Sequence, residues 1–435
     1  MNYNLHFVDR CNTNNRLSDQ RFPLIASKVI IQLSEKHYDA IVVGAGPAGS
    51  SVARKAAEQG VNVLIIDRKR EIGYPMQCGE LVPTVEEFPN ILPRAKRAEK
   101  LFNLPKWVIS NTCSRVAVIG PSKKIHEFNF GQNILDRSRF DKWLVMNATK
   151  AGAELWTCCN AIKVESDGRE VLAKKEGKII RLKANVLVAA DGPSSNMAKN
   201  LGLGSNDPKD LIVTMEYFMG GVDIDADLTE VYFGKEYAPG GYAWIIPKGE
   251  GMANVGLGIR TSFSERGVSL KDYIERFISK HPIASKKFQK GVILSRTGGL
   301  VPVGGPIEKT YSENAIVVGD AAGQVMATNG GGIPPAVICG DIGGEAIAQK
   351  LRGENDLSFY EKEWKSEVGK ELDTGVKIRK IVDIALRNDK LAERILEIFE
   401  GKIVREVILC RLSMPLNLVY KTVMGLRQSL KVLKR

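Results

Sequence analysis

The sequence predicts an α/β fold in which a parallel-sheet domain, split into three stretches of sequence, encloses an antiparallel-sheet domain and is followed by helices. Three observations lead to this prediction. Strand, helix and strand follow one another between residues 38 and 66, as in a βαβ unit. Residues 210–302 alternate apolar and polar residues in short runs, as antiparallel strands do. Asn314–Val318 then returns to the apolar pattern of a buried parallel strand.

The elements expected along the chain give its domain organisation. Strands are expected at 40–43, 61–66 and 184–190, helices at about 47–59, 139–151 and 268–280, and helices again beyond about 355, while 70–135 looks irregular apart from alternating stretches such as 115–119. We expect these divisions: an N-terminal extension (1–36), three parts of the parallel-sheet domain (37–110, 137–204 and 306–352), strands of the second domain (111–136 and 205–305) and a C-terminal helical region (353–435).

Composition and charge limit the possible partners. The 435 residues are 44% hydrophobic and 26% charged, which is ordinary for a globular chain. The net charge is +12, and residues 401–435 hold eight Lys and Arg against the single acid Glu406. Such a tail suits an anionic membrane surface, although a solvated helix face is an equal alternative. We expect contact with a membrane surface and none with nucleic acid.

The sequence shows no signal peptide and no spanning segment. Charged residues interrupt the first 37 positions, and the uncharged stretch 321–340 contains five glycines and two prolines. Seven cysteines form no CxxC pair and no metal spacing, which indicates a reducing compartment. The expected location is cytoplasmic, peripheral on the inner face of the cell membrane.

A glycine-rich turn, Gly44-Ala45-Gly46-Pro47-Ala48-Gly49, follows the first predicted strand. Gly44 permits the sharp turn, Gly46 lets backbone N–H groups approach a pyrophosphate, and Gly49 permits close packing of helix on strand. Asp67 ends the second strand, where a carboxylate accepts hydrogen bonds from ribose hydroxyls. We expect Ala48 and Arg68 to contact the same cofactor. The glycine-rich turn and Asp67 together predict a Rossmann-like dinucleotide-binding domain.

Later elements select the cofactor. Asp191 ends the strand at 184–190, and Asp320 ends the strand at 314–318, shortly before a second glycine-rich helix start at Gly330–Ile333. The Asp320 carboxylate suits ribityl hydroxyls, and N–H groups at Gly332 and Ile333 suit the flavin edge that becomes negative on reduction. A nicotinamide-binding domain does not require this second glycine-rich helix start and its preceding aspartate. We therefore expect FAD, and no metal ion.

The residues from Pro239 to Gly258, PGGYAWIIPKGEGMANVGLG, carry a family resemblance. They resemble the Tyr-x-Trp-x-Phe-Pro strand and the Asn-Val-Gly-hydrophobic-Gly run of the geranylgeranyl reductase family, a branch of the para-hydroxybenzoate-hydroxylase-like flavoproteins. The resemblance extends from Tyr38 to about Gln349. It implies an FAD-dependent oxidoreductase acting on CH–CH groups, which saturates double bonds of geranylgeranyl chains, in archaea those of ether-linked membrane lipids.

The resemblance also implies flavin contacts by position. Tyr74–Glu80 matches a family stretch, which places the Cys78 thiol next to the flavin, and the Arg137 guanidinium suits a pyrophosphate. The full set carried over is Gly49, Asp67, Cys78, Gly79, Arg137, Ala161, Asp320, Gly332 and Ile333.

Aromatic residues predict the substrate wall. Tyr242 and Trp244 alternate on one strand and so share a face, where their rings can confine a prenyl chain, although ordinary sheet core is the alternative. Ile246 and Pro247 complete the expected wall. Ile246 stands where the family usually has Phe, and Ala327 where proline is common, so we expect an altered chain-length preference and a looser loop beside the flavin.

The proton donor and the reductant stay open at this stage. Hydride attack alone on an isolated alkene would leave an unstabilised carbanion, so a proton is needed, with Cys78, Tyr242, a bound water or the flavin itself as donors. The histidines at 6, 37, 126 and 281 lie outside every motif. No second nicotinamide cradle or iron–sulfur cysteine cluster is visible in the sequence, so the reductant is expected from outside: ferredoxin, reduced deazaflavin or NAD(P)H.

Two other classes of protein remain as alternatives. A flavin-dependent monooxygenase or halogenase has a similar strand motif, although Tyr242 replaces its first Trp. A non-catalytic prenyl-lipid carrier of the GDP-dissociation-inhibitor type uses a related fold, but the Gly319-Asp320 cradle argues against it.

Overall fold

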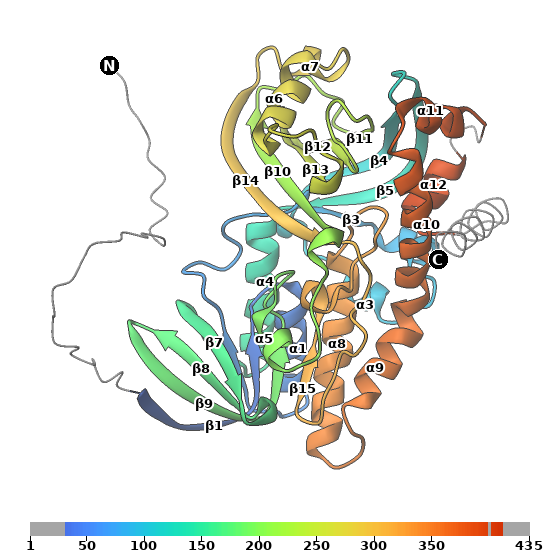
Figure 1. Ribbon diagram of the computed structural model, residues 1–435. Coiled ribbons are helices and arrows are strands. Elements are labelled where there is room, and N and C mark those ends of the chain that lie inside the picture. The colour runs from blue at the N-terminus through green and yellow to red at the C-terminus, as the bar shows by residue number, and fades with distance from the viewer. Residues whose placement is uncertain (1–30, 399–401, 412–435) are drawn as a thin grey trace, which may run out of the picture.

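The computed structural model describes residues 31–398 and 402–411 (Figure 1). The chain forms two sheets, one in the lower half and one in the upper half of the view, and the C-terminal helices run along one side of both. The predicted α/β class with an antiparallel second domain is confirmed.

The first sheet is mostly parallel, in the order β6-β2-β1-β9-β8-β7, with β15 paired to the end of β9. Only the hairpin contacts β7–β8 and β8–β9 are antiparallel. Strands buried on both faces, such as Ala40–Val42 and Val186–Ala189, form its centre. Its members are β1 (Ile31–Val43), β2 (Val63–Ile66), β6 (Glu154–Trp156), β7 (Cys159–Glu165), β8 (Glu170–Lys175), β9 (Lys178–Ala189) and β15 (Ala315–Val317).

Helices α1 (Pro47–Glu58), α4 (Arg137–Lys150) and α8 (Ile333–Leu351) pack together on this sheet. Small residues on α1 and glycines on α8 let these two helices approach closely: a Cβ at Gly344 would lie 2.5 Å from the Val52 carbonyl oxygen. A further helix, α5 (Asn196–Asn200), follows β9.

The second sheet has eight strands in the order β14-β10-β13-β12-β11-β4-β5-β3. All its pairs are antiparallel except β11–β4. Helices α6 (Leu270–Lys280) and α7 (Ala284–Lys287) cover one face, where Tyr273 and Phe277 are fully buried. The strands are β3 (Leu81–Pro83), β4 (Ile109–Ile119), β5 (Ile125–Leu135), β10 (Leu211–Gly220), β11 (Leu228–Tyr232), β12 (Tyr242–Gly249), β13 (Met252–Ile259) and β14 (Val292–Pro302).

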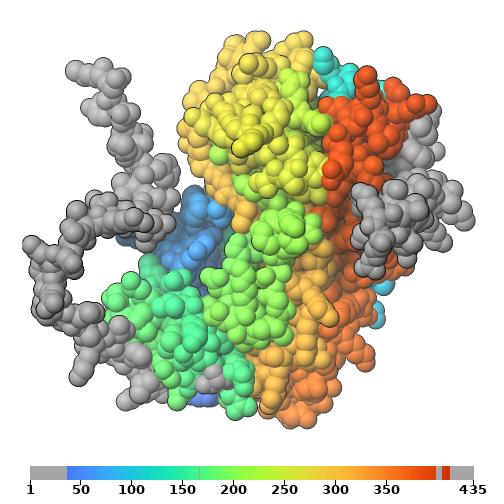
Figure 2. Space-filling view, in the orientation of Figure 1, coloured from blue at the N-terminus to red at the C-terminus, as the bar shows by residue number. Residues whose placement is uncertain are grey.

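The C-terminal helices are joined to both halves by buried or half-buried ion pairs. Arg260 of the second domain pairs with Asp383, and Arg379 pairs with Asp210 at 2.7 Å. The guanidinium of Arg97 contacts Asp341, Glu345 and Glu367 at 2.6–2.8 Å. Figure 2 shows this part of the chain, coloured orange to red, along one side of the molecule. The C-terminal helices are α9 (Ser358–Trp364), a π-helical turn (Lys365–Gly369), α10 (Lys370–Ala385), α11 (Asp389–Ile398) and α12 (Lys402–Ile408). Two short helices, α2 (Phe88–Ile91) and α3 (Ala98–Leu101), lie earlier in the chain.

Two features differ from the sequence expectation. β1 begins at Ile31 and not near Tyr38, because its first part pairs with the start of β9 across a register shift between Leu33 and His37 that hides the apolar pattern. The stretch 70–135, expected to be irregular, contains the two eleven-residue strands β4 and β5, and β3 joins their sheet although it falls within 37–110.

Candidate active site

A cavity of about 530 Å³ opens between the two sheets and the C-terminal helices. Its wall includes the turn after β1, the segment 73–83, one face of the second sheet, the loop that leads into α8, and α10 to α12. Most of this wall is apolar, and its charged groups gather near Cys78 and Asp320. A single space therefore joins the predicted nucleotide cradle to the predicted substrate wall.

The glycine-rich turn is built as the motif requires. Gly44 has φ +108°, and a Cβ there would lie 2.2 Å from the Ala190 carbonyl oxygen, while one at Gly49 would lie 1.9 Å from the Gly44 oxygen. Gly46 is different: it lines the cavity and a Cβ there would meet no atom within 4 Å. Two of the glycines thus serve close packing, and Gly46 leaves space for a ligand at the start of α1.

The second cradle lies at the start of α8. Asp320 sits in a 3₁₀ turn after β15, and a Cβ at Gly332 would lie 3.1 Å from its Oδ1 atom. Burial raises the pKa of Asp320 to about 6, and the Arg137 charge opposes that rise. Asp320, Gly332 and Ile333 all line the cavity, so segments far apart in sequence meet at one site.

Arg137 is the first residue of α4 and lines the cavity. Its Nε and Nη2 atoms each donate to the Asp141 carboxylate at 3.0 Å, a bidentate pairing that fixes the guanidinium plane. Its charge also acts on the Cys78 thiol, whose pKa burial raises and Arg137 lowers. The guanidinium is thereby positioned where an anionic group can be bound.

Asn254 joins the Cys78 segment to the predicted substrate wall on β12. Its Oδ1 atom accepts a hydrogen bond from Trp244 Nε1 at 2.8 Å, and its Nδ2 donates to the Cys78 carbonyl oxygen at 3.0 Å. Beside it, Glu80 pairs with Lys248 at 2.8 Å and accepts from the Arg137 backbone N–H at 3.0 Å. This network fixes residues 78–80 against β12 and β13.

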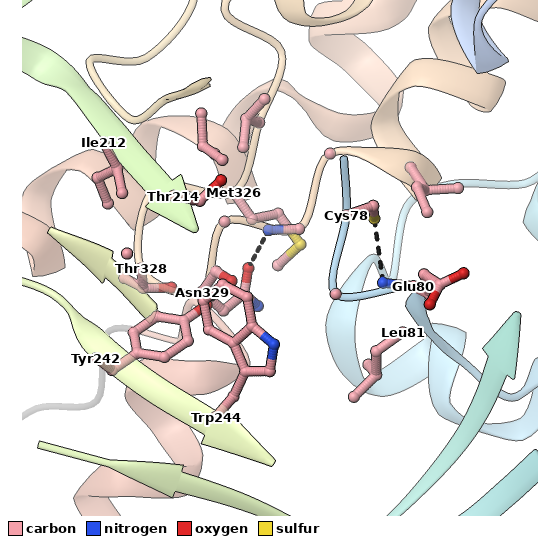
Figure 3. A pocket seen from close by; sticks show the side chains of 18 of the residues that line it. Cys78, Glu80, Leu81, Ile212, Thr214, Tyr242, Trp244, Met326, Thr328 and Asn329 are labelled. Atoms are coloured by element: carbon pink, nitrogen blue, oxygen red, sulfur yellow. Dashed lines mark hydrogen bonds between the residues drawn. The ribbon is translucent and has the colours of Figure 1, made fainter. Parts of the chain in front are cut away.

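Tyr242, Trp244 and Ile246 face the cavity from one side of β12. The Tyr242 and Trp244 rings lie 5.9 Å apart at 61°, and the Tyr242 hydroxyl donates to the Asn329 carbonyl oxygen at 2.6 Å. Figure 3 shows these two rings beside the loop of Met326, Thr328 and Asn329, across the cavity from Cys78 and Glu80. Burial raises the pKa of Tyr242 to about 12.

Glu216 was not expected from the sequence. It lies on the cavity face of β10, is 2% exposed, and burial raises its pKa to about 7. Neither the Glu216 side chain nor the role of α10 to α12 in the wall was predicted. A signal for Glu216 was present, since it is the only charged residue within the strand segment LIVTMEYFMG.

Several predicted site residues do not line the cavity, for local reasons. Asp67 accepts from Ala45 N and Lys69 N, each at 2.8 Å, and so supports the glycine turn. The Asp191 carboxylate accepts from Asn196 N and Met197 N at the start of α5. Arg68 is exposed, Ala161 packs on β7 against the core of the first sheet, and Pro247 falls on the opposite face of β12 from Trp244 because side chains alternate.

The residues present fit FAD. Gly46 and Gly192 leave open space at the carboxyl ends of β1 and β9, where parallel sheets of this kind bind nucleotides. Each Asp67 carboxylate oxygen accepts one hydrogen bond from a backbone N–H and retains a lone pair for a ribose hydroxyl. A dinucleotide cradle that opens beneath an antiparallel sheet defines the class: an FAD-dependent oxidoreductase.

Comparisons with known proteins give the family. The family models "Geranylgeranyl reductase catalytic domain" and "Pyridine nucleotide-disulphide oxidoreductase" match residues 210–301 and 38–216. Digeranylgeranylglycerophospholipid reductase 2 of Methanopyrus kandleri is 39% identical over 79% of this chain and 86% of its own length. The Methanocaldococcus jannaschii reductase is 37% identical over 85% and 95%. The chain belongs to the geranylgeranyl reductase family, with the digeranylgeranylglycerophospholipid reductases as relatives.

Solved structures agree with this assignment. A geranylgeranyl bacteriochlorophyll reductase-like protein from Thermoplasma acidophilum superposes with a TM-score of 0.77 at 29% identity, covering 91% of this chain and 100% of that one. A flavin-dependent brominase superposes with a TM-score of 0.66 at 18% identity, covering 91% and 100%, which shows a shared fold only. Among the described residues, no helix is both long and apolar enough to cross a membrane.

The open space at Gly46 predicts a selective defect. Gly46→Ala should leave the unfolding free energy of the apoprotein within about 0.5 kcal/mol, because its φ of −76° suits alanine. FAD affinity should fall roughly tenfold or more, because the methyl group enters the ligand space. Denaturation and flavin-fluorescence titration test this. Gly49→Ala is the contrasting variant, and it should lower the free energy of unfolding by about 1–3 kcal/mol. Equal FAD affinity for Gly46→Ala and the native chain would contradict the assignment of Gly46 to the FAD site.

The buried Glu216 carboxyl predicts a pH-dependent stability. A raised pKa in the folded state means that folded protein holds the proton more tightly than unfolded protein, so stability falls as pH rises between about 4.5 and about 7. Glu216→Gln removes this loss. The free energy of unfolding of the apoprotein variant, compared with that of the native apoprotein, should therefore rise by roughly 2–3 kcal/mol between pH 5 and pH 8. Urea unfolding at both pH values measures it. Glu176→Gln, at an exposed turn, should show no such gain.

Proposed function

We propose that this chain saturates carbon–carbon double bonds of geranylgeranyl chains on ether-linked membrane glycerophospholipids, with FAD as its cofactor. The observation that carries the proposal is the continuous cavity from Asp320 and Gly332 to the apolar wall of β12 and the C-terminal helices. The named activity of the relatives supports it. A long prenyl chain needs an extended apolar surface, which this cavity provides.

Distinct parts of the wall have distinct roles in this proposal. Gly46, Arg137, Asp320 and Gly332 hold FAD, which supplies the hydride when reduced. Tyr242 and Trp244 confine the prenyl chain, and their ring faces stabilise positive charge that develops on the alkene when it is protonated. Cys78 orders this end of the cavity together with Asn254.

The far wall of the cavity comes from the C-terminal helices. Apolar side chains of α10, α11 and α12 line it, and they exclude water from the alkene, which protects positive charge from capture. They are Val382, Ala385, Leu386, Ala392, Ile395, Leu396, Val404, Val407 and Ile408.

An anaerobic experiment tests the function. With dithionite-reduced holoprotein, addition of a geranylgeranyl glycerophospholipid should reoxidise the flavin and add two hydrogen atoms per double bond, read by absorbance and mass spectrometry. Ala385→Trp, which fills the cavity from α10, should slow this reoxidation about tenfold or more while FAD uptake is unchanged.

The controls separate the alternatives. Lys377→Trp, exposed on the same helix, should reoxidise at the native rate. Flavin that is reoxidised by oxygen in the presence of halide or an aromatic substrate, but never by the lipid, would favour a monooxygenase or halogenase. Protein that binds the lipid but takes up no FAD would favour a prenyl-lipid carrier.

We further propose an external reductant and a membrane contact. The sequence carries one dinucleotide motif and no iron–sulfur cysteine cluster, so ferredoxin, reduced deazaflavin or NAD(P)H is expected to reduce the flavin. The basic tail would hold a cytoplasmic protein at the anionic inner face of the membrane, where its lipid substrate lies. Its residues Lys421, Arg427, Lys431, Lys434 and Arg435 lie outside the described residues.

Vesicle binding tests the tail. Replacement of these five basic residues by Gln should weaken sedimentation with anionic vesicles, by about 1 kcal/mol for each charge that contacts the surface, and leave neutral vesicles unaffected. The weakening should diminish at high salt. Unchanged binding of the variant to anionic vesicles would contradict the membrane proposal.

A further inference from the structure

Glu216 occupies the cavity face of the second sheet beside Trp244. On β10, Ile212, Thr214 and Glu216 line the cavity in alternation. Glu216 pairs in register with Gly256 of β13, and Gly256 pairs with Trp244 of β12. A Cβ at Gly256 would lie 2.4 Å from the Trp244 ring and 2.9 Å from the Glu216 Cβ, so the glycine lets the ring lie next to the carboxyl.

The carboxyl is buried and only partly bonded. Its Oε2 atom accepts a long hydrogen bond, 3.4 Å, from Asn254 Nδ2. Its Oε1 atom is buried and has no hydrogen-bond partner among the residues that the structure describes. An unsatisfied buried carboxyl oxygen is costly unless a function or a bound group accounts for it. The packing therefore points to a role for Oε1 in the cavity.

Two charged side chains on different elements act on Glu216. Glu80, on the segment beside Cys78, raises its pKa, while Arg137 of α4 lowers it. Both neighbours already have partners: Glu80 pairs with Lys248 and Arg137 with Asp141. Asn254 and the Cys78 backbone N–H favour the charged form, but burial outweighs them. Within residues 31–398 and 402–411, no cation is therefore paired with Glu216, and its carboxyl holds a proton near neutrality.

We propose that Glu216 is the catalytic acid, which delivers a proton from its carboxyl group to the alkene carbon of the prenyl chain; this rests on the proposed function. The O–H bond of Glu216 breaks and one C–H bond forms, and the hydride that the reduced cofactor supplies forms the second. The alkene gains two electrons and the cofactor loses two. The Glu216 carboxylate then regains a proton from water before the next turnover.

Cys78 and Tyr242, the other two donors beside Glu216 in the cavity, are weaker acids. Burial raises the pKa of the Cys78 thiol above its usual value near 9, and that of Tyr242 to about 12, and the Tyr242 proton is already bonded to Asn329. Burial brings Glu216 to about 7. Near neutral pH a donor of this acidity is both substantially protonated and the strongest acid of the three.

Glu216→Gln and a matched control test the proposal. Glu230→Gln makes the same change at a buried glutamate of β11 that faces away from the cavity and pairs with Lys287. Reduced holoprotein carrying Glu216→Gln should be reoxidised by the lipid roughly 100-fold more slowly than native, and Glu230→Gln at the native rate. The rate at which the lipid reoxidises native protein should fall as pH rises through about 7. The residual rate of Glu216→Gln should not show this fall.

A second readout does not depend on turnover. Infrared difference spectra of native protein should show a protonated carboxylic acid that titrates near pH 7, apart from that of Asp320, which titrates near pH 6. The component near pH 7 should be absent from Glu216→Gln and present in Glu230→Gln. A native rate in Glu216→Gln with FAD bound, or no such carboxyl band in native protein, overturns the assignment of Glu216. If native protein is never reoxidised by the lipid, the proposed function fails instead, whatever the infrared titration shows.

Discussion

The site depends first on the close crossing of α1 and α8. A Cβ at Gly340 would lie 2.6 Å from the Ala48 carbonyl oxygen, so any larger residue would push the helices apart. Both helices begin at the cavity, with Gly46 before one and Gly332 before the other. Their crossing therefore sets the spacing of two backbone cradles that are nearly 290 positions apart in the chain. A nucleotide that reaches both needs this spacing to be fixed before it binds.

The second constraint joins the two sheets. Asn254 holds Trp244 with one amide atom and the Cys78 backbone with the other, and the buried pair of Glu80 and Lys248 lies next to it. A buried pair of this kind contributes little net stability after desolvation, but loss of one partner leaves an uncompensated charge. Its effect here is geometric, because it fixes the position of residues 78–80 relative to the β12 wall of the cavity.

Local patterns in the sequence were sufficient for the fold class, the family and the cofactor. Gly46, Cys78, Arg137, Asp320, Tyr242 and Trp244 were predicted and all line the cavity, because motif spacing and strand alternation are local properties. Pro247 could have been excluded by the same alternation. The contributions of Glu216 and of α10 to α12 depend on contacts between distant segments, which periodicity within a single segment does not reveal. The backbone hydrogen bonds of the Asp67 and Asp191 carboxylates were not foreseen for a related reason, since strand-end spacing does not show which N–H groups lie nearby.

The charges of the cavity fall into two sets with different physical roles. Arg137 with Asp141 and Lys248 with Glu80 are closed ion pairs, at 3.0 Å and 2.8 Å. Within the described residues, Glu216 and Asp320 have no such partner, and burial raises both pKa values toward neutrality. Negative charge brought to this site by a bound anionic group would raise them further. These two unpaired carboxyls are therefore placed to take up protons when such a group binds, while the closed pairs hold the surrounding segments together.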